Sequence, residues 1–165
     1  MRPADLACVA AIQAGAYAVD LLEDDATLRA RLCGFPETAW VAEGPSGVCA
    51  YLVAYRSVLD KVSPLGGHFE SSESANCLYL HDLAIDARAA GQKVGSLLVG
   101  QALLAAEKQG LAYSALVSVQ NSQAFWQRLG YQSRTLAEPQ QQLHLATYPG
   151  QGIYMTQALG GESAI

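Results

Sequence analysis

The sequence predicts a mixed α/β fold: one domain over residues 1–165, with a mostly antiparallel, twisted sheet of six to seven strands flanked by about four helices. The first observation behind this prediction is the order of segments, in which two helical stretches precede two strands joined by a tight turn. The second is that the later strands alternate with helices, which is typical of crossover connections in one mixed sheet. The length of 165 residues and the 51% hydrophobic content suit a domain that buries its own core.

The first third of the chain carries both helical stretches and both strands. Residues 5–18 form one broad apolar face at helical spacing, and Asp24–Cys33 repeats the pattern with Gly34 beyond its end. Residues 38–42 and 48–55 are rich in β-prone side chains. Because the turn-forming residues 43–47 separate them, we expect a hairpin.

A long irregular segment follows this hairpin. From Arg56 to Ala75 the chain contains Pro64, Gly66-Gly67 and a polar run over residues 70–74, and no helical or strand period. Loops of about twenty residues are uncommon inside a compact domain and are usually mobile or functional.

The second half of the chain alternates strands and helices. Strands are expected over 77–85 and 113–119, from Tyr131, and over 153–158; helices are expected from Val94 to near Gly110 and from Asn121 or Ser122 to Leu129. The helix after Val94 is the clearest, since its apolar residues recur every three or four positions. An exposed edge at 153–158 could pair with a second copy, so a homodimer is one expectation.

Composition excludes several classes of protein. Only ten Lys and Arg residues and a net charge of −5 argue against a nucleic-acid partner, while an acidic balance suits a cationic substrate. No apolar run reaches the length of a membrane span and the N-terminus lacks signal-peptide character, so we expect a cytoplasmic protein with no membrane partner. The four cysteines lie far apart, without the spacing of a zinc cluster, and no metal is expected.

Residues 77–110 have the layout of an anion site. An apolar strand leads through the loop Ala90-Gly91-Gln92-Lys93-Val94-Gly95-Ser96 into a helix, and the first N–H groups of a helix have no partner within it. A phosphorylated ligand is therefore expected at this loop. The alternative is an ordinary strand–helix unit with a glycine turn.

The segment order, the loop at 90–96 and the run Asn121-Ser122-Gln123-Ala124-Phe125-Trp126-Gln127-Arg128-Leu129-Gly130-Tyr131 together resemble the GNAT superfamily of acetyl-CoA-dependent N-acetyltransferases. The resemblance implies transfer of an acetyl group from acetyl-CoA to an amine. It also implies that CoA contacts a strand, the loop after it and a later helix. The implied cofactor-binding residues are Leu83, Ala84, Ile85, Ala90, Gly91, Gln92, Lys93, Val94, Gly95, Ser96, Asn121, Ser122 and Trp126.

The loop departs from the family motif in two positions. Ala90 stands where Arg or Gln is usual, and Lys93 stands where the first glycine is usual, so Gly95 alone remains of the signature. Backbone N–H groups can bind phosphate without the arginine, but Lys93 must then tolerate the backbone conformation that glycine would adopt. The departures leave an alternative function open, a non-catalytic acyl-CoA-binding or regulatory module. A nucleotide-binding protein is disfavoured because the loop lacks the motifs of a P-loop and of a dinucleotide fold.

His81 is the candidate general base, because an imidazole titrates near neutral pH and this residue precedes the segment expected at the pantetheine arm. The alternative is a structural histidine bonded within the sheet. The family often carries a Tyr four residues before the helix-ending glycine, but this chain has Trp126 there, and an indole is no practical proton donor. Tyr131, Ser122 or a water is therefore expected to act as the acid for the leaving thiolate, unless the thiolate leaves unassisted.

The resemblance and the local charge together suggest an acceptor pocket formed by Tyr17, Glu23, Asp24 and Asp82. Four acids lie within residues 20–25, which can be a rim that attracts an amine or simply a solvated, acid-rich helix start. Asp82 is adjacent to His81 and would point to the opposite face of an unbroken strand, unless a β-bulge intervenes. The expected acceptor is a small, cationic amine or a protein amine, with the 56–75 loop closing over it.

Overall fold

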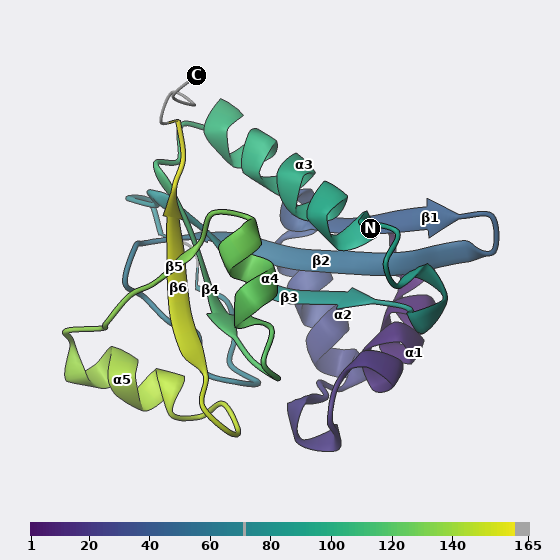
Figure 1. Ribbon diagram of the computed structural model, residues 1–165, viewed down its shortest axis with the longest axis horizontal. Helices are drawn as coiled ribbons and strands as arrows, with labels where there is room; N and C mark the ends of the chain where they lie inside the picture. The colour runs from purple at the N-terminus through teal and green to yellow at the C-terminus, as the bar shows by residue number, and fades with distance from the viewer. Residues whose placement is uncertain (71, 161–165) are drawn as a thin grey trace.

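A computed structural model of the chain describes residues 1–70 and 72–160, and in this part of the chain six strands form one sheet in the order β1-β2-β3-β4-β6-β5 (Figure 1). The strands are β1 (Ala39–Gly44), β2 (Gly47–Ser57), β3 (Cys77–Ile85), β4 (Tyr113–Ser118), β5 (Gln132–Ser133) and β6 (Ile153–Ala158). The helices are α1 (Leu6–Ala16), α2 (Asp25–Gly34), α3 (Val94–Lys108), α4 (Gln123–Arg128) and α5 (Pro139–Leu145). The predicted mixed α/β class is confirmed.

Two differences from the sequence prediction concern the C-terminal part. Helix α5 was not predicted, although Pro139 in its first turn is a favourable helix start. Strand β6 has the predicted bounds, but it lies between β4 and β5 and is not the last strand of the sheet. The expectation of an exposed edge at 153–158 is therefore wrong, because the two-residue strand β5 covers part of that side.

Helices cover both faces of the sheet (Figure 1). Alternate β2 residues Ala50, Leu52 and Ala54 pack beneath α3, whereas Tyr51 and Val53 face α1 and α2. Because β2 is buried on both faces, its sequence is almost continuously apolar. Within the described residues, no helix has both the length and the apolar character needed to cross a membrane.

The sheet opens between β3 and β4, its one parallel pair of strands. These strands are paired only from Cys77–Tyr113 to Leu80–Leu116, while β3 stays paired with β2 as far as Ile85. Beyond Leu80, the side of β3 that faces β4 therefore has no strand partner. The result is a wedge-shaped gap in the sheet.

A β-bulge lies at the point where β3 and β4 separate. Val53 and Ala54 are consecutive on β2, but they pair with Asp82 and Leu80, so His81 is an extra residue on β3. Leu80 and Leu83 both belong to the core beneath α3, whereas His81 and Asp82 both contact side chains on the opposite face. An unbroken strand would have placed His81 and Asp82 on opposite faces. The structure has the bulged alternative, and the bulge brings the two side chains to the same face.

The irregular segment between β2 and β3 is held in place by α5 and the chain after it. Gln141 accepts a hydrogen bond from the backbone N–H of Val62 at 2.7 Å, and the Tyr148 hydroxyl donates to the Ser63 carbonyl at 2.9 Å. Asp60 also forms a two-point ion pair with Arg134 at 2.7 and 2.8 Å. The segment packs as an ordered cover over the α1 and α2 side of the sheet; Ser71 lies outside the described residues.

Two glycines of α3 give a matched test of how closely this helix approaches the sheet. A Cβ on Gly95 would come within 2.6 Å of the Ile85 Cδ1 atom, whereas a Cβ on Gly100 would meet nothing within 4 Å. Because Cδ1 is the far end of a flexible side chain that can shift, we expect Gly95→Ala to lower the free energy of unfolding by about 1 kcal/mol, at the low end of the cost of overpacking. Gly100→Ala is expected to raise it by about 0.5–1 kcal/mol, because alanine restricts the unfolded chain. Urea denaturation of both variants measures the difference, and equal effects would contradict it.

Candidate active site

A cavity of about 430 Å³ lies at the opening between β3 and β4. Its walls come from six parts of the chain: β3, β4 with the turn after it, α4, the end of α1 with the segment that follows, the irregular segment between β2 and β3, and the chain after α5. Among its lining residues are Tyr17, Glu23, Leu65, Leu80, His81, Asp82, Leu83, Ile85, Leu116, Val117, Gln120, Ser122, Phe125, Trp126 and Tyr148. The candidates Tyr17, Glu23, His81, Asp82, Ser122 and Trp126, which come from different parts of the sequence, therefore share one cavity.

His81 is held in this wall by a buried carboxylate. Its Nε2 lies 3.3 Å from Oε1 of Glu23, and the two side chains are 3% and 5% exposed. The ring also packs edge-on against Phe69, at 5.0 Å between centroids. The Nδ1 atom of His81 is buried and has no hydrogen-bond partner among the described residues.

Burial, together with the neighbouring Arg31 guanidinium, lowers the pKa of His81 to about 3. The imidazole is therefore neutral at neutral pH. A neutral imidazole has one N–H donor and one lone pair, so one of its ring nitrogens is free to accept a proton.

Glu23 is also the partner of Arg31. Both Arg31 terminal nitrogens donate to its carboxylate, with Nη2 at 2.5 Å from Oε1, and Nη2 donates to the Gly67 carbonyl at 3.1 Å. The guanidinium carbon lies 4.5 Å from the centroid of the Phe69 ring. Glu23 was predicted to bind the acceptor amine directly, but its carboxylate is already occupied by Arg31 and His81.

Asp82 accepts hydrogen bonds from two tyrosines. The Tyr17 hydroxyl lies 2.8 Å from Oδ1, and the Tyr51 hydroxyl lies 2.6 Å from Oδ2. Burial is the main cause of the raised pKa of both tyrosines, and the Asp82 charge adds to it. Neutral hydroxyls stabilise the carboxylate without cancelling its charge, so Glu23, Arg31 and Asp82 together leave one net negative charge at the cavity.

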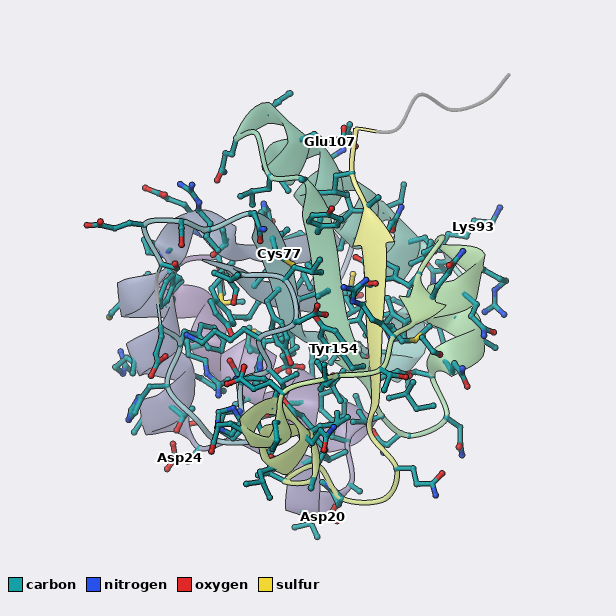
Figure 2. All side chains as sticks on the ribbon, turned by 90° about the vertical axis from the view of Figure 1, so that its left-hand side faces the viewer. Asp20, Asp24, Cys77, Lys93, Glu107 and Tyr154 are labelled. Carbon is teal, nitrogen blue, oxygen red and sulfur yellow. The ribbon has the colours of Figure 1, made fainter. Side chains whose placement is uncertain are left out.

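Asp24 lies outside the cavity lining. Its side chain accepts the Thr27 N–H at 2.7 Å and caps the start of α2, and this bond lowers the pKa of the exposed carboxyl. Figure 2 shows Asp24 at the molecular surface. For Asp24, the alternative interpretation of this acid-rich segment, a solvated helix start, is therefore the correct one.

Tyr131 also lies outside the cavity lining. It is 1% exposed, its hydroxyl lies 2.6 Å from that of Ser114, and burial raises its pKa above the usual value for tyrosine. The sequence placed it in the site because it follows Gly130, but the ring packs against Trp126 in the core beneath α3. A hydroxyl buried in this way cannot reach the cavity to protonate a leaving group.

The turn between β4 and α4 supplies Ser122 to the cavity, and α4 supplies Trp126. The Trp126 indole N–H donates to the Ser122 hydroxyl at 3.2 Å, and the Ser118 hydroxyl lies 3.0 Å from the same oxygen. Gln120 and Asn121 both have positive φ angles, of 50° and 59°. Asn121 therefore forms the turn, and Ser122 is the residue that precedes the helix.

The loop before α3 contains the residues expected to bind phosphate. Gly91 and Lys93 both have positive φ angles, of 75° and 61°, and Lys93 occupies the position that directly precedes the helix. Lys93 thus adopts the left-handed conformation that glycine favours but that an L-residue can reach. In the described part of the chain, the N–H groups of residues 93–96 have no protein acceptor. Figure 2 shows Lys93 at the surface.

The profile of the Acetyltransferase (GNAT) family matches residues 11–131. The chain therefore belongs to the GNAT acetyltransferase family. No curated protein sequence matches it significantly.

Solved structures share the whole fold at low sequence identity. The GNAT-like decarboxylase GphF in complex with isobutyryl-CoA is 18% identical with a TM-score of 0.73, covering 96% of each chain. The ribosomal-protein-S18-alanine N-acetyltransferase from Escherichia coli is 19% identical with a TM-score of 0.65, covering 100% of this chain and 96% of that one. Naa20 from Chaetomium thermophilum, in complex with a bisubstrate analogue, is 17% identical with a TM-score of 0.66, covering 96% and 84%.

The buried imidazole gives a prediction for stability against pH. Because the folded-state pKa of His81 is about 3 and the ordinary value is 6.5, the unfolded chain binds one more proton between these values. Stability therefore falls as the pH drops below about 6.5, by about 1.4 kcal/mol per pH unit from this group. In His81→Gln this contribution is absent, so urea denaturation at about pH 7, 6 and 5 should show a shallower decline. His68→Gln, which removes an exposed imidazole, is the control, and an unchanged slope in His81→Gln would contradict the prediction.

Proposed function

We propose that the protein is an N-acetyltransferase that moves an acetyl group from acetyl-CoA to a primary amine by direct attack in a ternary complex. The observation that carries the proposal is a neutral histidine on the wall of a cavity that opens beside the unpaired side of β3. One ring nitrogen of this histidine has no partner among the described residues. Family membership supports an acyltransferase, and similar structures hold CoA compounds, namely the GphF decarboxylase and a Mycobacterium tuberculosis protein, Rv2747.

The residues present suit a CoA ligand at two places. The side of β3 that lacks a strand partner over Leu83, Ala84 and Ile85 faces the place where a pantetheine arm would lie, although the Leu83 carbonyl already accepts the Tyr17 hydroxyl at 2.7 Å. The N–H groups of residues 93–96 offer donors to a pyrophosphate. The Lys93 ammonium adds a positive charge at the same end of α3. Acetyl-CoA would supply the acetyl thioester, whose carbonyl carbon the amine attacks.

The acceptor attacks as a neutral amine, after its ammonium proton has passed to solvent. His81 takes the second proton, which the nitrogen loses once it has attacked, in this proposal. The lowered pKa keeps the imidazole unprotonated but also makes it a weak base. We therefore expect the proton to move after the nitrogen has bonded to the carbonyl carbon, when that nitrogen has become acidic. The C–S bond then breaks and releases the CoA thiolate, with the Ser122 hydroxyl or a water, in place of Tyr131, as the proton donor.

The net negative charge at the cavity favours a cationic acceptor. Asp82 is stabilised only by neutral hydroxyls, so its charge can attract an ammonium group, and Tyr17 presents its hydroxyl beside it. The acceptor is a small cationic amine or the amine of a protein. One of the similar structures is, by its description, a ribosomal-protein-S18-alanine N-acetyltransferase, the enzyme from Escherichia coli.

A second candidate is a non-catalytic acyl-CoA-binding module. It is favoured by Trp126 in place of the family's tyrosine and by the burial of Tyr131. The tyrosines that do line the cavity, Tyr17 and Tyr148, already donate to protein acceptors, to Asp82 and to the Ser63 carbonyl. In that case the same loop would bind CoA, but no acetyl group would be transferred.

Release of free CoA thiol from acetyl-CoA, measured with a panel of polyamines, amino acids and N-terminal peptides, tests the proposal. Cys8 and Cys33 are exposed free thiols, so the protein alone must be measured as a blank in any thiol assay. Turnover with an amine and formation of its acetyl amide, identified by mass spectrometry, support the transferase. Tight binding of acetyl-CoA by calorimetry without turnover for any amine would favour the binding module.

A further inference from the structure

We propose that Glu23, held by Arg31, is a positioning residue that fixes the tautomer of His81 and leaves Nδ1 as the proton acceptor. The inference rests on the proposed function, because it gives that histidine its role. It assigns Glu23 a task other than binding the acceptor amine.

The first step concerns the charge state of Glu23. Its carboxylate receives donors from both terminal nitrogens of Arg31, and both side chains are about 5% exposed or less. A guanidinium has only donors, so it favours the ionised, acceptor-only form of the carboxylate. Glu23 therefore has no proton to give to His81.

The second step concerns the imidazole. An acceptor-only carboxylate oxygen lies 3.3 Å from Nε2, so Nε2 must carry the ring proton and donate it. In the neutral ring the lone pair then falls on Nδ1. This nitrogen has no partner among the described residues, although the side chain is almost fully buried and lines the cavity.

The third step concerns rigidity. Gln13 binds the backbone of Glu23 on both sides, donating to its carbonyl at 2.9 Å and accepting its N–H at 3.0 Å. The Arg31 guanidinium lies over the Phe69 ring, and the same ring packs edge-on against the His81 imidazole. The carboxylate, guanidinium and imidazole are thus held by residues of α1, α2 and β3 and by Phe69 of the segment between β2 and β3, as expected for a group whose orientation matters.

A buried, unpaired acceptor is costly, and a purely structural histidine would be expected to satisfy both ring nitrogens. Among the described residues, two buried atoms of the cluster have no partner, Nδ1 of His81 and Nε of Arg31, and Nδ1 is the only acceptor of the two. Nδ1 is therefore the atom of the cluster that can accept a hydrogen bond from a ligand. A donor N–H from an amine in the cavity would satisfy it.

The test reads the tautomer directly and does not need activity. In protein labelled with ¹⁵N at histidine, long-range proton–nitrogen correlation at about pH 7 separates the two ring nitrogens, because a bare and a protonated nitrogen have very different shifts. We expect His81 in the ligand-free protein to carry its proton only on Nε2. A proton on Nδ1 would overturn the proposal in the wild-type protein, whether or not any variant folds.

Glu23→Gln adds a kinetic readout. Glutamine has similar size but can donate as well as accept, so we expect a mixture of the two tautomers and a turnover number lower by about 10–100-fold. The KM for acetyl-CoA should change by about twofold or less. Glu43→Gln is the matched control, since Glu43 also pairs with an arginine, at 3.0 Å, but on the exposed surface.

The two proposals fail in different ways. The expected tautomer without turnover for any amine would contradict the transferase while leaving the role of Glu23 in place. Full turnover in Glu23→Gln, or an unchanged tautomer in that variant, would overturn the positioning role while leaving the transferase intact.

Discussion

Replacing Arg31 by methionine is expected to lower the free energy of unfolding by about 3–5 kcal/mol, because it leaves the buried carboxylate of Glu23 without its charged partner. The size of the effect follows from burial: the two side chains are only 4% and 5% exposed. Urea denaturation followed by the fluorescence of Trp40 and Trp126 measures it. Arg2→Met is the control, since Arg2 is 71% exposed and its surface ion pairs contribute about 1 kcal/mol or less.

The double variant Arg31→Met with Glu23→Leu distinguishes two contributions to the free energy of unfolding: the cost of burying one unpaired charge, and the net contribution of the ion pair itself. Removing both charges is expected to recover most of the stability lost in Arg31→Met, since a buried ion pair replaced by apolar side chains is often neutral or stabilising. Additive losses in the double variant would instead mean that packing around Phe69 dominates. A free energy of unfolding higher than that of the wild type, in Arg31→Met alone or in Glu23→Leu alone, would contradict the prediction.

Replacing His81 by glutamine is expected to lower the turnover number by about 10²–10⁴-fold, because the variant lacks the imidazole that accepts the proton of the amine in this proposal. Affinity for CoA should stay nearly unchanged, since the backbone groups expected to bind it lie elsewhere on β3 and at the start of α3. Steady-state kinetics with the best amine of the panel, together with calorimetry of CoA binding, measure the two quantities.

The same pair of measurements distinguishes a base from a structural residue. An equal loss of CoA affinity and turnover would assign His81 a structural role in the bulged part of β3. The His68→Gln variant, which changes an exposed histidine outside the described cavity lining, should retain both values.

Local sequence patterns predicted most of the elements. The apolar spacing after Val94 predicted α3, and alternating or continuous apolar runs predicted β2, β3 and β6, because side-chain period is set by local backbone geometry. Helix α5 was missed because its seven residues are glutamine-rich and carry little apolar periodicity; contacts with the 58–65 segment hold it instead.

The site was predictable only in part. His81, Ser122 and Trp126 line the cavity as expected, because their positions follow directly from the strand and the helix start that carry them. Arg31 was not singled out, because a lone arginine in an amphipathic helix is usually solvent-exposed, and nothing local indicates that it meets Glu23. Tyr131 and Asp24 were assigned to the site by proximity in sequence, whereas packing turned one into the core and the other to solvent.

The sequence by itself determined the order of helices and strands, the glycine-bearing loop at the start of α3 and the family to which the chain is similar, since these depend on period, turn chemistry and short motifs. Only the tertiary structure decided which charges meet. The bulge at His81 turns two neighbouring side chains to the same face, and the approach of α2 to β3 encloses Glu23 between Arg31 and His81. Such pairs join residues far apart along the chain, and their energies depend on burial, which no local pattern encodes.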